Sequence, residues 1–226
     1  MHASALGKLV AVSPHLDDAV FGCGALLAGC REAVVITVFA GIPSGAQDPT
    51  PWDRACGFSD AVEAVMCRRA EDKAALDLLD ARAVWLQFLD SQYGASPFEH
   101  DIAAALDRVM AAERPQTILI PMGLYHSDHE LTHAACLSVR RHASDPTWLL
   151  YEDALYRRHP GLLQKRLALL LEHGVVATPA FTKAVGRTKR DAVRAYASQT
   201  KVLGAKRLRD TDMSEAFWRI DGVDDG

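Results

Sequence analysis

Residues 10–28 read V-A-V-S-P-H-L-D-D-A-V-F-G-C-G-A-L-L-A, and this stretch decides the fold of the chain. Its apolar beginning predicts a buried parallel strand over residues 9–13, which Pro14 ends because proline lacks the N–H that a strand ladder needs. A segment rich in glycine and alanine follows with helical periodicity, which predicts a helix over residues 18–30. A strand that leads directly into a helix is typical of an α/β protein.

Three side chains that can bind a metal or carry a proton, His15, Asp17 and Asp18, lie between this strand and this helix. The carboxyl end of a strand is where open α/β sheets bind their ligands. In a purely structural interpretation, one aspartate is the N-cap of the helix and His15 is a residue of the preceding loop. The three groups together favour a functional site.

Apolar and β-branched runs alternate with helical patterns over the first 150 residues. Strands are predicted at residues 33–39, 83–88, 117–121 and 148–151, and helices at residues 60–80, 98–113 and from about 128. A long loop is expected at residues 40–58 and a basic helix at residues 187–209. The alternation predicts a doubly wound, mostly parallel, Rossmann-like sheet with helices on both faces.

The length of 226 residues suits one sizeable domain. We expect that domain to span residues 1–226, with a core at 1–150 and a C-terminal extension at 151–226 packed on it. The net charge of −4 argues against a nucleic-acid partner. No apolar run is long enough to span a membrane, and the N-terminus lacks secretory-signal features. Five cysteines without a C-x-x-C pair indicate a reducing compartment, so we expect a cytoplasmic protein.

A second group of candidate ligands follows the fourth predicted strand, where residues 121–133 read P-M-G-L-Y-H-S-D-H-E-L-T-H. It contains His126, Asp128 and His129. In the common strand order 3-2-1-4-5, strands one and four are neighbours and the order reverses between them, so both groups would face one crevice. Mixed histidine and aspartate ligands suit a catalytic zinc with one position left for water. The remaining carboxylates and imidazoles could act as general base and acid.

The same residues permit other interpretations. His129-Glu130-Leu131-Thr132-His133 matches H-E-x-x-H, the signature of zincin metalloproteases. A zincin places this pattern well inside a helix, whereas here it opens a helix after a strand and leaves the first group of ligands without a role. A phosphoacceptor receiver domain would use the aspartates, with Asp90 as the phosphorylated residue. That interpretation needs a lysine after the fifth strand, and none lies near Tyr151.

The two groups together resemble the motifs of the LmbE/PIG-L superfamily of metal-dependent N-acetylglucosaminyl deacetylases. Residues 14–19, P-H-L-D-D-A, are similar to its P-H-P-D-D-E motif, and residues 126–129, H-S-D-H, are similar to its H-x-D-H motif. Residues 68–71, R-R-A-E, resemble its R-x-x-E on the second helix. The resemblance implies a hydrolase that removes an acetyl group from an N-acetylglucosamine-type conjugate.

The resemblance also implies roles for individual residues. The implied zinc ligands are His15, Asp18 and His129, and Fe²⁺ is the alternative to Zn²⁺. Asp17 would be the general base, and His126, oriented by Asp128, would stabilise the oxyanion and protonate the leaving amine. Arg68 would help to bind the substrate.

Three positions depart from the family pattern: Leu16, Ala19 and Tyr125 stand where proline, glutamate and glycine are usual. None is an implied zinc ligand, so metal binding is expected to persist, while the missing glutamate bears on substrate contacts. The expected partner is a small amino-sugar conjugate, and a homo-oligomer is compatible with the sequence. A family member that binds such a conjugate without cleaving it is the non-enzymatic alternative.

Overall fold

The computed structural model describes residues 6–45, 48–94, 96–143 and 145–221. Within them one sheet has the strand order β3-β2-β1-β4-β5-β7-β6. The strands are β1 (Leu9–Ser13), β2 (Ala33–Thr37), β3 (Ala81–Trp85), β4 (Thr117–Pro121), β5 (Thr147–Tyr151), β6 (Val176–Lys183) and β7 (Glu215–Asp221). β1 to β5 run parallel, whereas β7 pairs antiparallel with both β5 and β6. The predicted mostly parallel sheet, whose order reverses between β1 and β4, is confirmed.

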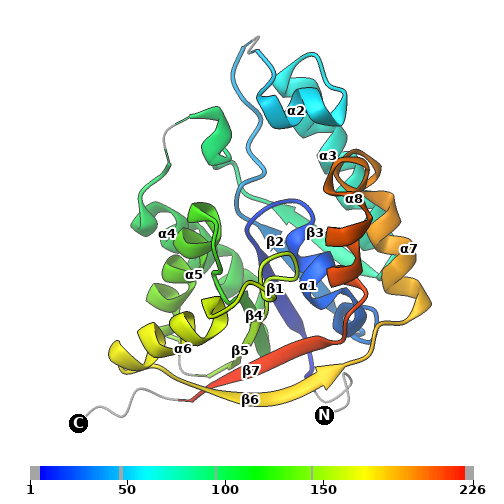
Figure 1. The fold of residues 1–226 in the computed structure, drawn as a ribbon. Coiled ribbons are helices and arrows are strands. Elements are labelled where there is room, and N and C mark those ends of the chain that lie inside the picture. Colours follow the sequence, from blue (N-terminus) through cyan, green and yellow to red (C-terminus); the bar gives the residue numbers. More distant parts are fainter. Residues whose placement is uncertain (1–5, 46–47, 95, 144, 222–226) are drawn as a thin grey trace.

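Helices cover both faces of the sheet (Figure 1). One side carries α1 (Asp18–Leu27), α3 (Ala61–Leu78), α7 (Arg187–Ala195) and α8 (Ala197–Thr211). The other side carries α4 (Glu99–Glu113), α5 (Ser127–Arg140) and α6 (Leu162–Glu172). Two short helices, α2 (Pro51–Cys56) and η2 (Ser91–Tyr93), lie in connections that follow β2 and β3. The helices on both faces were predicted from the alternation of patterns.

The core consists of two apolar layers, one on each face of the sheet. Side chains of β1 alternate between them: Leu9 and Ala11 pack in one layer, and Val10 and Val12 pack in the other. All four are fully buried, as expected for a strand whose two faces are covered. The rigid centre of the sheet therefore holds the carboxyl ends of β1 and β4 in fixed positions.

A buried ion pair supports a break in α1 at Cys23, whose φ of −141° is not helical. The Glu215 carboxylate accepts hydrogen bonds from the N–H groups of residues 25–26, at 2.7 and 3.0 Å. Lys189 Nζ donates to the carbonyl of Phe21 at 2.7 Å and lies 2.8 Å from Glu215. The backbone groups freed by the break thus have hydrogen-bond partners inside the core. Because Glu215 lies in β7 and Lys189 in α7, these two elements hold α1 in place.

Several expectations for the connections and the C-terminal part need correction. Residues 40–58 were expected to form only a loop, but Thr50 caps α2 through a capping box, so a helix forms there. The basic helix expected at residues 187–209 is two helices that meet at Tyr196. The antiparallel pair β6 and β7 was not predicted, because β6 is largely exposed and neither strand forms a continuous apolar run. Among the described residues, no helix has both the length and the apolarity to cross a bilayer.

Candidate active site

The two predicted groups of ligands meet at the carboxyl ends of β1 and β4. These strands pair in parallel, so the segment after β1 and the first turn of α5 lie side by side. The ring centroid of His15 lies 5.2 Å from that of His126 and 5.3 Å from that of His129. Residues more than 100 positions apart in sequence therefore share one site, at the point where the strand order reverses.

His15, Asp18 and His129 present three ligand atoms that lie within 4.8 Å of one another. Asp18 Oδ2 is 3.2 Å from His15 Nδ1 and 3.1 Å from His129 Nε2. Two imidazole nitrogens and one carboxylate oxygen are the donor set of many catalytic zinc sites with an open fourth position. The chemistry of these donors therefore fits a divalent cation such as Zn²⁺ or Fe²⁺.

His129 is further fixed by Asp153, which the sequence analysis did not single out. His129 Nδ1 lies 2.6 Å from Asp153 Oδ1, and both side chains are buried. Asp153 also accepts a hydrogen bond from the backbone N–H of Leu124. A carboxylate on the far nitrogen fixes the tautomer of a ligating histidine and leaves its other nitrogen free for a metal. The position of Asp153 just after β5 was the available signal, because β5 ends at the same edge of the sheet.

The carboxylates at this site have strongly different proton affinities. Burial and the neighbouring Asp18 raise the pKa of Asp17 to about 7. Burial also acts to raise the pKa of Asp18, but the nearby His129 and His15 outweigh it and hold that pKa well below its usual range. A carboxyl group that ionises near neutral pH beside one that stays ionised is the pattern expected of a general base beside a ligand.

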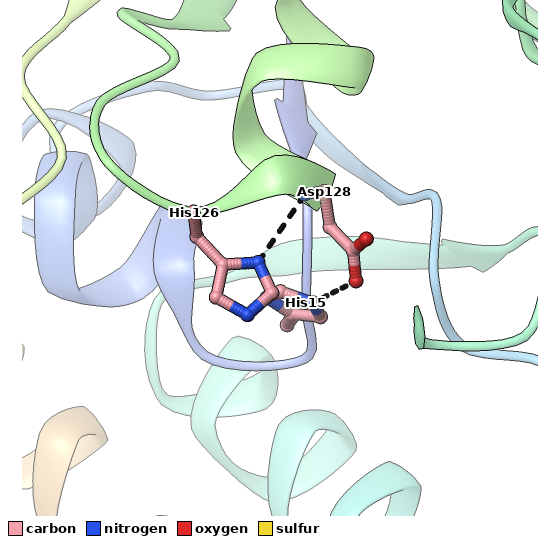
Figure 2. A group of neighbouring side chains, drawn as sticks. All are labelled: His15, His126 and Asp128. Atoms are coloured by element: carbon pink, nitrogen blue, oxygen red, sulfur yellow. Dashed lines mark hydrogen bonds and ion pairs between the residues drawn. The ribbon is translucent and has the colours of Figure 1, made fainter. Parts of the chain in front are cut away.

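His126 and Asp128 occupy the first turn of α5, as Figure 2 shows. His126 is the N-cap of this helix, and its Nδ1 accepts a hydrogen bond from the backbone N–H of Asp128 at 3.2 Å. The Asp128 carboxylate instead lies 3.0 Å from His15 Nε2 and accepts the backbone N–H of Ser91 at 3.2 Å. Asp128 thus contacts His126 with its backbone N–H and His15 with its carboxylate.

His15, which follows β1, and His126, the N-cap of α5, differ in the charges around them. Burial acts to lower the pKa of His15, but Asp90, Asp128 and Asp18 outweigh it and raise that pKa well above its usual value. Burial and the nearby His15 lower the pKa of His126. Asp90, placed 3.7 Å from His15 Nε2 by the loop after β3, is a further acidic group of the site.

Arg68 lies on α3 and is largely buried at the edge of the site. Its Nη2 donates to Asp53 Oδ1 at 2.6 Å, and its Nη1 donates to the Tyr93 hydroxyl at 2.9 Å. That hydroxyl in turn donates to the same Asp53 oxygen at 2.9 Å. The guanidinium therefore joins α2, which carries Asp53, to η2, which carries Tyr93. Sequence reasoning missed both partners, because each lies in a connection without periodic pattern.

A cleft of about 460 Å³ opens over these groups. Its polar floor contains His15, Asp17, Asp18, His126 and His129, and Arg68 and Arg207 also line it. Its walls include Phe39, Trp52, Leu155 and Tyr156. Two larger hollows, of about 710 and 1030 Å³, contain none of these polar floor residues. The cleft combines apolar walls with a few convergent polar groups, which is typical of a small-molecule site.

The H-E-x-x-H pattern lies in the first half of α5, and its two histidines have different partners. His133 Nδ1 donates to the carbonyl of Pro121 at 2.9 Å, and burial lowers the pKa of His133 to about 4. Glu130 is 57% exposed at its side chain and pairs with Arg166. Among the described residues, two sets of three side chains could hold a metal, His15 with Asp18 and His129, and His15 with His126 and Asp128, and His133 is in neither set. This geometry favours the ligand set that uses His129 with His15 and Asp18.

The fold and the site define an α/β protein with a histidine–aspartate ligand cluster at the switch point of its sheet. Residues 10–140 match the family of PIG-L, GlcNAc-PI de-N-acetylase, and this match covers more than half of the chain. The chain belongs to the PIG-L family. No curated protein sequence matches it significantly.

Solved structures of deacetylases are similar over nearly the whole chain. A triple mutant of a deacetylase of the teicoplanin biosynthetic pathway has 28% identity and a TM-score of 0.77, covering 97% of this chain and 100% of that one. The deacetylase of the antimicrobial A40926 pseudoaglycone has 27% identity and a TM-score of 0.78, covering 98% and 100%. N,N'-diacetylchitobiose deacetylase from Pyrococcus horikoshii, with 19% identity, a TM-score of 0.62 and coverage of 95% and 83%, shares the fold. Family and neighbours support an N-deacetylase of N-acetylglucosamine-type conjugates.

Proposed function

We propose that this chain is a metal-dependent amidohydrolase that removes the N-acetyl group from an N-acetylglucosamine-type sugar conjugate. The observation that carries the proposal is the convergence of His15, Asp18 and His129 on one point, with Asp17 and His126 beside it in the same cleft. A divalent cation bound there would act as a Lewis acid and make a water molecule more acidic. The solved deacetylases to which the chain is similar support the reaction class.

Asp17 is proposed as the general base. Its carboxylate lines the cleft beside the three ligands, and its raised pKa suits it to accept a proton near neutral pH. Attack of water on an amide places negative charge on the carbonyl oxygen and needs an acid for the amine that leaves. His126, whose ring centroid lies 5.2 Å from that of His15, is proposed for both tasks when protonated. Burial and the nearby His15 lower its pKa, and Asp128 and Asp90 act in the opposite direction.

The arrangement of a candidate acid and base beside the candidate ligands supports this proposal over a binding protein without catalysis. A chain that only bound a sugar conjugate would need neither a buried carboxylate of raised pKa nor an imidazole 5.2 Å from a candidate ligand. The zincin alternative would need His133 at the site, whereas its Nδ1 is bonded to the backbone of β4. The deacetylase therefore accounts for more of the buried polar groups than either alternative.

The test is release of a primary amine from N-acetylglucosamine conjugates by the purified, metal-loaded protein. We expect amine and acetate in equal amounts, loss of activity on chelation, and recovery when Zn²⁺ or Fe²⁺ is returned. The Asp17→Asn variant is the matched control, since it keeps the three ligands and removes the base. Absence of amine release from every conjugate by the metal-loaded protein would contradict the proposal.

A further inference from the structure

Tyr125, next in sequence to the cleft residue His126, has an unusual backbone conformation. It directly precedes His126, its φ is +69°, and it is 64% exposed. The left-handed region favours glycine, and a bulky residue there is strained. The backbone turn alone therefore gives no reason for a tyrosine at this position.

The ring of Tyr125 stacks on two others to form what we term the aromatic platform, made of Tyr125, Tyr156 and His159. Its centroid lies 5.2 Å from that of Tyr156 at an interplanar angle of 26°, and 5.3 Å from that of His159 at 11°. The centroids of Tyr156 and His159 are 6.5 Å apart. Tyr125 remains 64% exposed in spite of these two contacts, so part of its ring is open to solvent.

The aromatic platform is continuous with the candidate active site. Tyr156 lines the cleft, and its ring meets His129 edge-on with centroids 5.3 Å apart. The surface therefore runs from a candidate metal ligand, through Tyr156, to the exposed face of Tyr125. A single ligand could therefore place its acetylated amine on the floor of the cleft and an aromatic ring on the exposed part of Tyr125.

We propose that Tyr125 is a specificity-determining residue that binds an aromatic ring of the group attached to the amino sugar. This inference rests on the proposed function, because it takes the reacting amide to lie at His15, Asp18 and His129. The rings of the platform already stack nearly face to face, and a further flat ring extends that geometry.

The test compares three acceptors of the same reaction: the phenyl glycoside of N-acetylglucosamine, its methyl glycoside, and N,N'-diacetylchitobiose. Tyr125→Gly removes the ring and relieves the positive φ, so it is not expected to impair folding. Tyr125→Phe keeps the ring and removes only the hydroxyl. We expect Tyr125→Gly to lower kcat/KM for the phenyl glycoside by about 2- to 10-fold, the range of one aromatic stacking contact. The methyl glycoside should be unaffected, and Tyr125→Phe should behave as the wild type.

Binding of the same glycosides, measured by calorimetry, separates this inference from the proposed function. Weaker binding of the phenyl glycoside by Tyr125→Gly supports the platform even if no amine is released. Amine release with equal losses for phenyl and methyl glycosides, or with no loss, overturns the platform and leaves the deacetylase intact. A Tyr125-dependent preference confined to the disaccharide, or no preference of the wild type for the phenyl glycoside, also overturns it.

Discussion

His129 Nδ1 and Asp153 Oδ1 lie 2.6 Å apart, with both side chains buried between β5 and the first turns of α5. This pair directs Nε2 of His129 toward Asp18, 3.1 Å away. Such outer carboxylates orient a ligating imidazole and raise its basicity, so their loss weakens a metal site without removing a ligand.

Asp153→Asn should lower the affinity for Zn²⁺ by about 10- to 100-fold. The amide cannot offer the charge that stabilises the imidazole in its ligating form. Competition with a chromogenic chelator measures the affinity directly. Glu130→Gln is the matched control, since it alters an exposed carboxylate in the same helix and should leave the affinity unchanged. Equal affinity in wild type and Asp153→Asn would show that this pair is only structural.

Asp17→Asn should lower kcat by about 10²–10⁴-fold, the usual contribution of a general base. The three candidate ligands are untouched, so the metal content of the variant should equal that of the wild type. Turnover and elemental analysis measured on the same sample show whether activity is lost while the metal is retained. A parallel loss of metal and activity would instead assign Asp17 to the ligand set.

Arg68 should act mainly by holding the loops around the cleft together. Its guanidinium donates hydrogen bonds to Asp53 and Tyr93. The η2 segment that carries Tyr93 also contains Ser91, whose backbone N–H donates to Asp128. Tyr93→Phe removes one part of this network without touching the guanidinium. Arg68→Met and Tyr93→Phe should therefore each lower kcat. The fold-decrease in kcat of the double variant should be smaller than the product of the two single fold-decreases.

A direct contact between Arg68 and the substrate would give another result. In that case Arg68→Met would raise KM, Tyr93→Phe would have little effect, and the two losses would multiply. Steady-state kinetics of the four proteins distinguishes the two roles of Arg68.

Asp72 should make the protein less stable as the pH rises from about 4 to 7. Burial raises its pKa to about 7 in spite of hydrogen bonds from Trp85 and Tyr196. Because the folded state then binds a proton that the unfolded state releases, the stability that this group contributes is present below its unfolded pKa and is lost through this window. The slope is at most about 1.4 kcal/mol per pH unit.

Asp72→Asn removes this titration and is the variant that tests it. Chemical denaturation at several pH values should give a free energy of unfolding that falls less steeply between pH 4 and 7 in Asp72→Asn than in the wild type. Identical slopes for the two proteins would show that Asp72 stays ionised in the folded state.

The sequence predicted most strongly where local pattern and burial coincide. β1 and β4 have the predicted bounds, because each is a short apolar run ended by a proline or followed by a loop. The meeting of His15 with His126 and His129 could be predicted from the strand order alone. β6 and β7 could not, because their pairing depends on contacts between distant segments rather than on an apolar run.

The supporting groups of the site were the least predictable. Asp53 and Asp153 look like ordinary loop aspartates in the sequence, and only the fold brings them to Arg68 and His129. The resemblance predicted that Asp128 orients His126; in the structure the backbone N–H of Asp128 bonds to His126, whereas its carboxylate lies beside His15. Which of these contacts dominates depends on tertiary geometry that no spacing rule specifies.

The most direct test of the central claim is the metal stoichiometry of the purified chain. We expect about one equivalent of zinc or iron per chain in the wild type and a large loss in each of His15→Ala, Asp18→Ala and His129→Ala. His133→Ala should retain the wild-type content. Full metal content in the three ligand variants, or loss only in His133→Ala, would contradict the account.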